Sequence, residues 1–198
     1  MRLYHKLITL MLFCFSALSC YATQWQLDAK NSTIAFVATQ NNAPIQGHFS
    51  VYKGDINFDP AHLDASTVNI TIETGSIAFS YQPITEALKT AQWLDVANFP
   101  VATFKASRLI NAGGDKYQAN GLLMIKGKSL PIEVDFIIEK SHEDKMIAKG
   151  KVTIQRLIFG IGQGEWADTS DIKNEVVVDF NLVLEQDAEP KRSAQVKR

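Results

Sequence analysis

The side chains that could bind a metal or act as a nucleophile are few and scattered in this chain. Cys14 and Cys20 both fall within the first 22 residues, so a chain cleaved after that point contains no thiol. Three later histidines, His48, His62 and His142, stand in separate turn-like or edge contexts, and none has a partner at the spacing of zinc ligands. We therefore expect no metal site built on cysteine or histidine.

An acidic cluster lies late in the chain, in the stretch GEWADTSD. Glu165, Asp168 and Asp171 bring three carboxylates close together, but they lack the regular alternate spacing of oxygen ligands in a calcium loop. The sequence also lacks the motifs G-x-S-x-G and H-E-x-x-H and a glycine-rich phosphate loop. A catalytic pair of carboxylates drawn from distant segments remains an open alternative, with Glu165 and Asp168 as its candidates.

Arg156 is the most unusual charged residue. It shares the parity of Val152, Ile154 and Ile158, so simple alternation places a guanidinium on the buried face of a strand. A buried charge must be paired or must bind an anion. Two interpretations stay open at this point. Arg156 is either a head-group or internal anchor at a cavity, or it is a residue at the barrel end that reaches solvent or follows a bulge that resets the parity.

Strands must position these residues, because apolar and polar side chains alternate along most of the chain. Such alternation predicts antiparallel strands with one buried face and one solvated face. Turn signals such as NNAP, NAGGDK, KGKS and SHEDK separate the runs. We therefore predict an all-β domain of about eight strands, either a closed barrel or a sandwich. The apolar members of the runs are Ile34, Phe36, Ala38; Val68, Ile70, Ile72; Ala102, Phe104, Ala106, Ile110; Tyr117, Ala119, Leu123, Ile125; Leu130, Ile132, Val134, Phe136, Ile138; Val152, Ile154, Ile158; and Val176, Val178, Phe180, Leu182, Leu184.

The stretch GHFSVYKGDINFDP, residues 47–60, has two alternating runs of opposite parity. Phe49 and Val51 belong to the first run, and Ile56 and Phe58 belong to the second. Gly54 stands between them, which predicts a bulge or turn at this glycine with a strand on either side.

One segment has helical spacing instead. Ile84, Ala87, Leu88 and Ala91 recur at the period of a helix, and prolines at positions 83 and 100 bracket the segment. We predict a short helix at about residues 84–96. It either covers the mouth of a barrel or packs on its outer surface, and periodicity does not distinguish the two.

The first 22 residues have the features of a cleaved export signal. Arg2 and Lys6 precede an apolar run at 7–18, which is too short to span a bilayer, and the segment ends in small residues up to Ala22. We predict one domain at 23–185 and a flexible polar tail at 186–198. Removal of the signal changes the formal charge from −1 to −3, so no basic field exists to attract nucleic acid.

Several motifs in a fixed order resemble the YceI-like family of exported bacterial polyisoprenoid-binding proteins. They are IQGHFSVYKGDINFDP, WLDVANFPVATFKAS, YQANGLLMIKGKSLPIEVDF and RLIFGIGQGEW. The resemblance runs from about Trp25 to Leu184, and it is specific because the motifs occur together. It implies a lipocalin-like antiparallel barrel with an elongated apolar tunnel, an isoprenoid lipid as ligand, no cofactor and no catalysis. It also implies a carrier located in the periplasm.

Combined with the strand parities, the resemblance assigns residues to the tunnel. Lys126, Arg156 and Trp166 are candidates for its mouth, where a hydroxyl, quinone or phosphate head group would lie. The expected lining residues are Phe36, Phe49, Val51, Ile56, Phe58, Ile70, Ile72, Leu88, Trp93, Phe104, Leu123, Ile125, Val134, Phe136, Ile154, Phe159 and Phe180.

Two other functions stay open as alternatives. One is a stress-related interaction module that binds a protein partner, and the other is an enzyme that acts on a lipid-like substrate. The expected partner of a carrier is an isoprenoid lipid, with transient contact at a membrane surface. The oligomeric state is open, with a homodimer as one option.

Overall fold

The computed structural model describes residues 24–142 and 144–186. The signal predicted at 1–22 lies outside this part, as does the tail predicted at 186–198 except for Gln186, which is the last residue of a strand. The strands are β1 (Gln24–Leu27), β2 (Thr33–Gln40), β3 (Ala43–Phe49), β4 (Tyr52–Asn57), β5 (Thr67–Glu73), β6 (Ile77–Ala78), β7 (Val101–Gly113), β8 (Lys116–Ile125), β9 (Lys128–His142), β10 (Lys145–Gln155) and β11 (Ile172–Gln186). The helix is α1 (Gln82–Lys89), and the 3-10 turns are η1 (Thr74–Ser76), η2 (Arg156–Phe159) and η3 (Gly164–Ala167).

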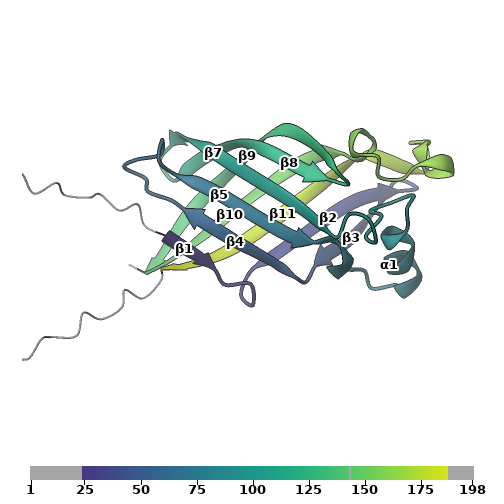
Figure 1. Ribbon diagram of the computed structural model, residues 1–198, viewed down its shortest axis with the longest axis horizontal. Helices are drawn as coiled ribbons and strands as arrows, with labels where there is room; N and C mark the ends of the chain where they lie inside the picture. Colours follow the sequence, from purple (N-terminus) through teal and green to yellow (C-terminus); the bar gives the residue numbers. More distant parts are fainter. Residues whose placement is uncertain (1–23, 143, 187–198) are drawn as a thin grey trace, which may run out of the picture.

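The strands form a closed antiparallel barrel (Figure 1). Alternation had predicted antiparallel strands in a barrel or a sandwich, and the resemblance had predicted the barrel. Pairing runs in the order β1-β4-β5-β7-β8-β9-β10-β11, and β1 also pairs with β11, which closes a ring of eight strands. β1 pairs with the C-terminal end of β11, and β2 pairs with the earlier part of that strand. β3 then pairs with β2 and β6, so the barrel wall continues beyond β1. Inward side chains of all the long strands consequently surround one interior.

The break between β1 and β2 is sealed by side-chain hydrogen bonds. The Ser32 hydroxyl donates to the carbonyl of Asp28 (2.7 Å) and accepts from the backbone N–H of Val183 (2.8 Å). The Tyr52 hydroxyl donates to the carbonyl of Ser32 (2.6 Å) from β4, the strand that pairs with β1. These bonds replace the missing ladder pairs, because buried backbone groups need a partner.

The break between β3 and β4 lies at Ser50 and Val51, so the prediction of a turn at Gly54 was wrong. Gly54 lies within β4, and Val51 is 45% exposed on the outer surface. Ser50 N–H donates to the carbonyl of Ser76 at the kink, and this bond to a distant segment takes the place of regular pairing. The inward residue after the kink is Tyr52, which is 7% exposed.

A bulge in β7 turns outward a residue, Ile110, that alternation had placed on the buried face. The register with β8 shifts between Ala106 and Arg108, so the extra residue reverses the parity of everything that follows. Leu109 therefore faces the interior at 5% exposure, and Ile110 faces outward at 38% exposure.

The helix is shorter than the predicted segment at 84–96. It ends at Lys89 because Thr90 adopts extended geometry, and the chain then turns with Trp93 N–H donating to the Thr90 carbonyl. Helix α1 lies at the same end of the barrel as η2 and η3, and β1 lies towards the other end (Figure 1). None of the helices in the described part of the chain has the length and apolar character that crossing a membrane would require.

Candidate functional site

A cavity of about 350 Å³ lies inside the barrel. Among the described residues that line it, Gln40, Thr74 and Arg156 have polar side chains, and the others are apolar apart from two tryptophan indoles. The Thr74 hydroxyl already donates to the carbonyl of Phe99 (2.7 Å), so it adds little polarity to the wall. Such a cavity has the surface chemistry for a long hydrocarbon and few groups to orient a polar ligand.

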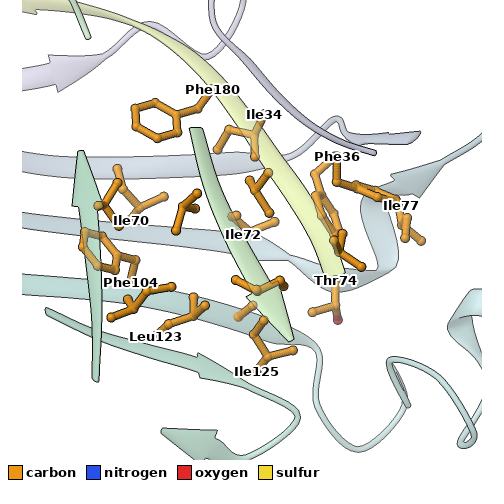
Figure 2. Close-up of a pocket in the computed structure, with 18 of the residues that line it drawn as sticks. Ile34, Phe36, Ile70, Ile72, Thr74, Ile77, Phe104, Leu123, Ile125 and Phe180 are labelled. Atoms are coloured by element: carbon orange, nitrogen blue, oxygen red, sulfur yellow. The ribbon is translucent and has the colours of Figure 1, made fainter. Parts of the chain in front are cut away.

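The wall is built by side chains that converge from several strands, as Figure 2 shows. Each lies on the inward parity of its strand, so the regular alternation of the sheet produces the apolar surface. The examples labelled in the figure include Ile34 and Phe36 from β2, Ile70 and Ile72 from β5, Phe104 from β7, Leu123 and Ile125 from β8, and Phe180 from β11.

One end of the cavity is closed by tightly packed side chains. Phe58 and Tyr117 meet edge to face with ring centroids 5.2 Å apart, and Tyr117 stacks on Phe136 at 5.7 Å. Met146 and Leu184 are each only 2% exposed at this end. Phe58, Phe136, Met146 and Leu184 line the cavity here and form its floor, and Tyr117 packs against two of them.

The other end opens beside α1. Ala87 on the helix is exposed, and Gln40, Ile45 and Trp166 around it are half-buried, although all of them line the cavity. The mouth therefore lies between α1, the tip of the β2–β3 hairpin and η3. Of the two placements considered for the predicted helix, the structure shows the one at the barrel mouth.

Most residues that were assigned to the tunnel face the cavity. Val51 does not, because the kink before β4 turns it outward, and Phe159 packs behind the wall at 2% exposure. Whether a lipid contacts the others stays a prediction. Those that line the cavity are Phe36, Phe49, Ile56, Phe58, Ile70, Ile72, Leu88, Trp93, Phe104, Leu123, Ile125, Val134, Phe136, Ile154 and Phe180.

The structure adds lining residues that had not been assigned to the tunnel. Most share the parity of a strand already recognised, so alternation alone could have found them. Ile84 and Ala87 needed the helix to be placed at the mouth, and Phe79 and Ile161 lie outside the regular elements. Strand residues in this group include Ile34, Ala38, Val68, Ala102, Ala119, Ile132, Ile138, Ala148, Val152, Val176, Val178, Leu182 and Leu184.

Arg156 is buried, at 1% exposure, and lines the cavity near its mouth. Its guanidinium lies 5.8 Å from the ring of Trp93, and burial lowers the pKa of Arg156 from its usual value. All five N–H groups donate to backbone carbonyl oxygens, which leaves none for a ligand head group. The acceptors are Lys173 (3.1 Å), Ile161 (3.0 Å), Gly162 (3.1 Å), Trp166 (2.7 Å) and Ile172 (2.9 Å).

Lys126 also acts on backbone carbonyls and does not line the cavity. Its Nζ donates to the carbonyls of Ala91 (2.7 Å) and Gly160 (2.9 Å), which ties the chain after α1 to the chain after η2. Lys128 donates to the carbonyl of Ile158 (3.0 Å) in the same segment. Of the three residues proposed for the mouth, only Trp166 is both half-buried at the opening and part of the lining.

The acidic cluster lies outside the cavity. Glu165, Asp168 and Asp171 are all exposed, and none belongs to the lining. Asp168 accepts from the backbone N–H of Ser170 (2.8 Å), and this bond lowers the pKa of Asp168. Over the described residues, no group of three or more potential ligands among His, Cys, Asp and Glu is placed to hold a metal ion.

Curated relatives match this chain over part of its length. A protein YceI of Salmonella newport is 30% identical over 131 residues, which cover 64% of this chain and 68% of that protein. UPF0312 proteins of Vibrio cholerae strains are 26% identical over 91 residues, or 46% of this chain and 48% of theirs. The chain thus spans about half the length of these Vibrio relatives.

Solved structures share the barrel. The BcnA protein of Burkholderia cenocepacia is 32% identical with a TM-score of 0.77, covering 79% of this chain and 98% of that one. A polyisoprenoid binding domain from Saccharophagus degradans is 17% identical with a TM-score of 0.68, over 82% of this chain and 98% of that one. The YceI protein of Campylobacter jejuni is 20% identical with a TM-score of 0.64, covering 74% and 87%. The latter two likenesses concern the fold. Residues 25–184 match the model of the YceI-like domain, and by that match the chain belongs to the YceI-like domain family.

Proposed function

We propose that this protein is a non-catalytic periplasmic carrier that holds an isoprenoid lipid, either a polyprenyl chain or the tail of a quinone, inside its barrel. The observation that carries the proposal is the apolar cavity of about 350 Å³, closed at one end and open beside α1. Membership of the YceI-like domain family and the name of the Saccharophagus structure support the choice of an isoprenoid.

The energetics favour a long apolar chain as ligand. Each buried methylene contributes about 0.8 kcal/mol, so a long tail has ample driving force to enter the cavity. Ordering of the tail offsets much of this gain. Because the polar lining is sparse, affinity should follow chain length and shape, with the head group left near Gln40 and Trp166 at the mouth.

A carrier fits the placement of the polar residues better than an enzyme does. Glu165 and Asp168, the candidates for catalytic carboxylates, are exposed and lie outside the cavity. Arg156 and Lys126 are engaged with backbone carbonyls. The location in the periplasm rests on the predicted signal at 1–22.

The test is mass spectrometry of an organic extract of the full chain, exported by its own first 22 residues and freshly purified. We expect a stoichiometric polyprenyl or quinone species. Two neighbouring leucines of β8 supply matched variants, since Leu123 lines the cavity and Leu122 is 54% exposed on the outer face. Leu123→Gln should reduce the amount of bound lipid, and Leu122→Gln should not.

An extract without lipid, combined with no uptake of added prenyl alcohol or quinone by the folded protein, would contradict the carrier function. Equal lipid content in Leu122→Gln and Leu123→Gln would place the lipid outside the cavity.

A further inference from the structure

Gly47 is an inward-facing residue of β3 that carries no side chain although its neighbours on that face do. Ile45 and Phe49, two residues before and after it, both line the cavity. The φ angle of Gly47 is not in the left-handed region, so its backbone conformation does not require glycine. The reason for a glycine at this position must lie in the space around it.

Two aromatic rings occupy that space. A Cβ placed on Gly47 would lie 2.6 Å from Cζ of Phe36 and 2.8 Å from Cδ2 of Phe79, and still closer to another atom of the Phe79 ring. The two rings pack edge to face with centroids 5.4 Å apart, and both line the cavity. They lie against the wall because Gly47 leaves room for them.

The pair of rings lies near the mouth, directly under the helix. Backbone N–H of Phe79 donates to the hydroxyl of Thr85 in α1 (3.0 Å), which fixes Phe79 to the helix that borders the opening. A chain that enters the cavity from this end must pass the two rings.

Two other inward glycines differ from Gly47 in what blocks a side chain. A Cβ on Gly150 would lie 2.5 Å from the carbonyl oxygen of Asp135, and one on Gly121 would meet the carbonyl oxygen of Lys105. The sheet itself therefore excludes a side chain at those positions. At Gly47 the three nearest atoms all belong to the two rings, so a methyl group would displace rings that have the open cavity beside them.

We propose that Gly47 is a specificity-determining residue of the tunnel, because it keeps the Phe36 and Phe79 rings against the wall and so sets a passage wide enough for a methyl-branched chain. The inference rests on the proposed function and specifies how the cavity selects its lipid. In this arrangement the passage under α1 limits the cross-section of the ligand.

The experiment compares Gly47→Ala with the parent protein, using all-trans-geranylgeraniol and 1-eicosanol as probes. The two alcohols have equal carbon number, but geranylgeraniol is methyl-branched and unsaturated, whereas eicosanol is linear and saturated. Rings displaced into the cavity would narrow the passage, so we expect binding of geranylgeraniol to weaken by about tenfold, which is about 1.4 kcal/mol, in Gly47→Ala. Binding of eicosanol should change much less.

Two further variants complete the design. Gly75→Ala is the matched control. A Cβ placed on Gly75 would have no other atom within 4 Å, and the φ angle of Gly75 is one that alanine adopts readily. In Gly47→Ala/Phe79→Leu the shorter side chain should restore binding of geranylgeraniol. If Gly47→Ala does not fold, Phe79→Leu alone carries the test, and we expect it to shift preference towards the branched alcohol.

Unchanged binding of both alcohols by folded Gly47→Ala would overturn the inference, as would equal loss of both without rescue by Phe79→Leu. If only Phe79→Leu can be tested, an unchanged preference between the two alcohols would overturn the inference. If the parent protein binds neither alcohol nor any longer prenyl compound, the proposed function fails and this inference fails with it.

Discussion

At the scale of the residue, Arg156 shows how a buried charge is accommodated without a carboxylate. Five carbonyl dipoles surround the guanidinium and satisfy every donor, so the charge is solvated by the backbone of the segment that follows it. The structure agrees with the internal anchor at a cavity, whereas the side chain neither offers a donor to a ligand head group nor reaches solvent. Its role is to hold the chain from η2 to β11 at the barrel mouth.

Replacing this arginine by lysine should therefore affect stability. Lysine has three N–H donors, so in Arg156→Lys at least two carbonyls lose their partner, and the free energy of unfolding should fall by about 2–5 kcal/mol. Urea titration of the variant measures this. Arg108→Lys is the matched control on the exposed face of β7, where the change should stay within about 0.5 kcal/mol. A variant of unchanged stability that loses lipid affinity would restore the head-group role.

Tyr52 should make the stability of the barrel depend on pH at the alkaline end. Burial, and then the negative charge of Asp28, raise the pKa of Tyr52. Because the pKa is higher in the folded state, the stabilising contribution of Tyr52 is fully present below the pKa of tyrosine in the unfolded chain, which is about 10. This contribution is lost as the pH rises through the pKa of the folded state. The expected window thus begins near pH 10.

The comparison is between the parent protein and Tyr52→Phe, with urea midpoints measured from neutral pH to about pH 11. At neutral pH the variant should be less stable by about 1 kcal/mol, since the carbonyl of Ser32 loses its donor. Above about pH 10 the parent should lose stability faster, so the difference narrows. A difference that stays constant with pH would contradict the assignment.

At the scale of the element, alternation predicted strands well wherever the ladder is regular and failed directly after each irregularity. Val51 follows a kink, Ile110 follows a bulge, and Ile158 lies in a 3-10 turn and is 51% exposed. A period of two assigns faces only while every residue advances the strand by one step. The irregularities depend on partners such as Ser76, which are distant in sequence, so the local pattern contains no signal for them.

The helix gives a second example. Its inward residues Ile84, Ala87 and Leu88 follow from helical spacing, but its end does not. The chain after Lys89 is held by Lys126, 35 residues from Ala91, through a bond to a backbone carbonyl. Any lysine side chain can make such a bond, so residue types alone do not reveal it.

The segment between η2 and η3 supplies a prediction at this scale. Gly162 has a φ of +73°, and a Cβ there would collide with Nη1 of Arg156, whereas Gly114 has a φ of +60° with open space around it. Gly114→Ala should cost about 1–2 kcal/mol for the left-handed backbone alone. Gly162→Ala should cost at least about 2 kcal/mol more, because it also disrupts the arginine. Equal urea midpoints for the two variants would show that Arg156 does not organise the segment.

At the scale of the whole molecule, the sequence predicts an apolar interior but not whether that interior is filled. The same inward residues would serve a packed core or a tunnel, and the resemblance to the YceI-like family was what favoured a tunnel. Whether the interior stays open depends on how rings such as Phe36 and Phe180 lie against the inward glycines at positions 47 and 150. That packing arises only after the strands are brought into register.

A barrel with an apolar cavity should be stabilised by the lipid that fills it. A ligand present at a hundred times its Kd adds about 2.7 kcal/mol to the free energy of unfolding. For a chain of this size that corresponds to a rise in Tm of about 5–10 °C. We therefore expect protein stripped of lipid by organic extraction and refolding to melt at a lower temperature than the protein as purified, and an added prenyl alcohol to restore the difference in a concentration-dependent way. The added prenyl alcohol should raise the Tm of Leu123→Gln less than that of Leu122→Gln, because only Leu123→Gln places a polar group in the cavity wall. A Tm that is the same with and without lipid would mean that the cavity stays unfilled in the native protein.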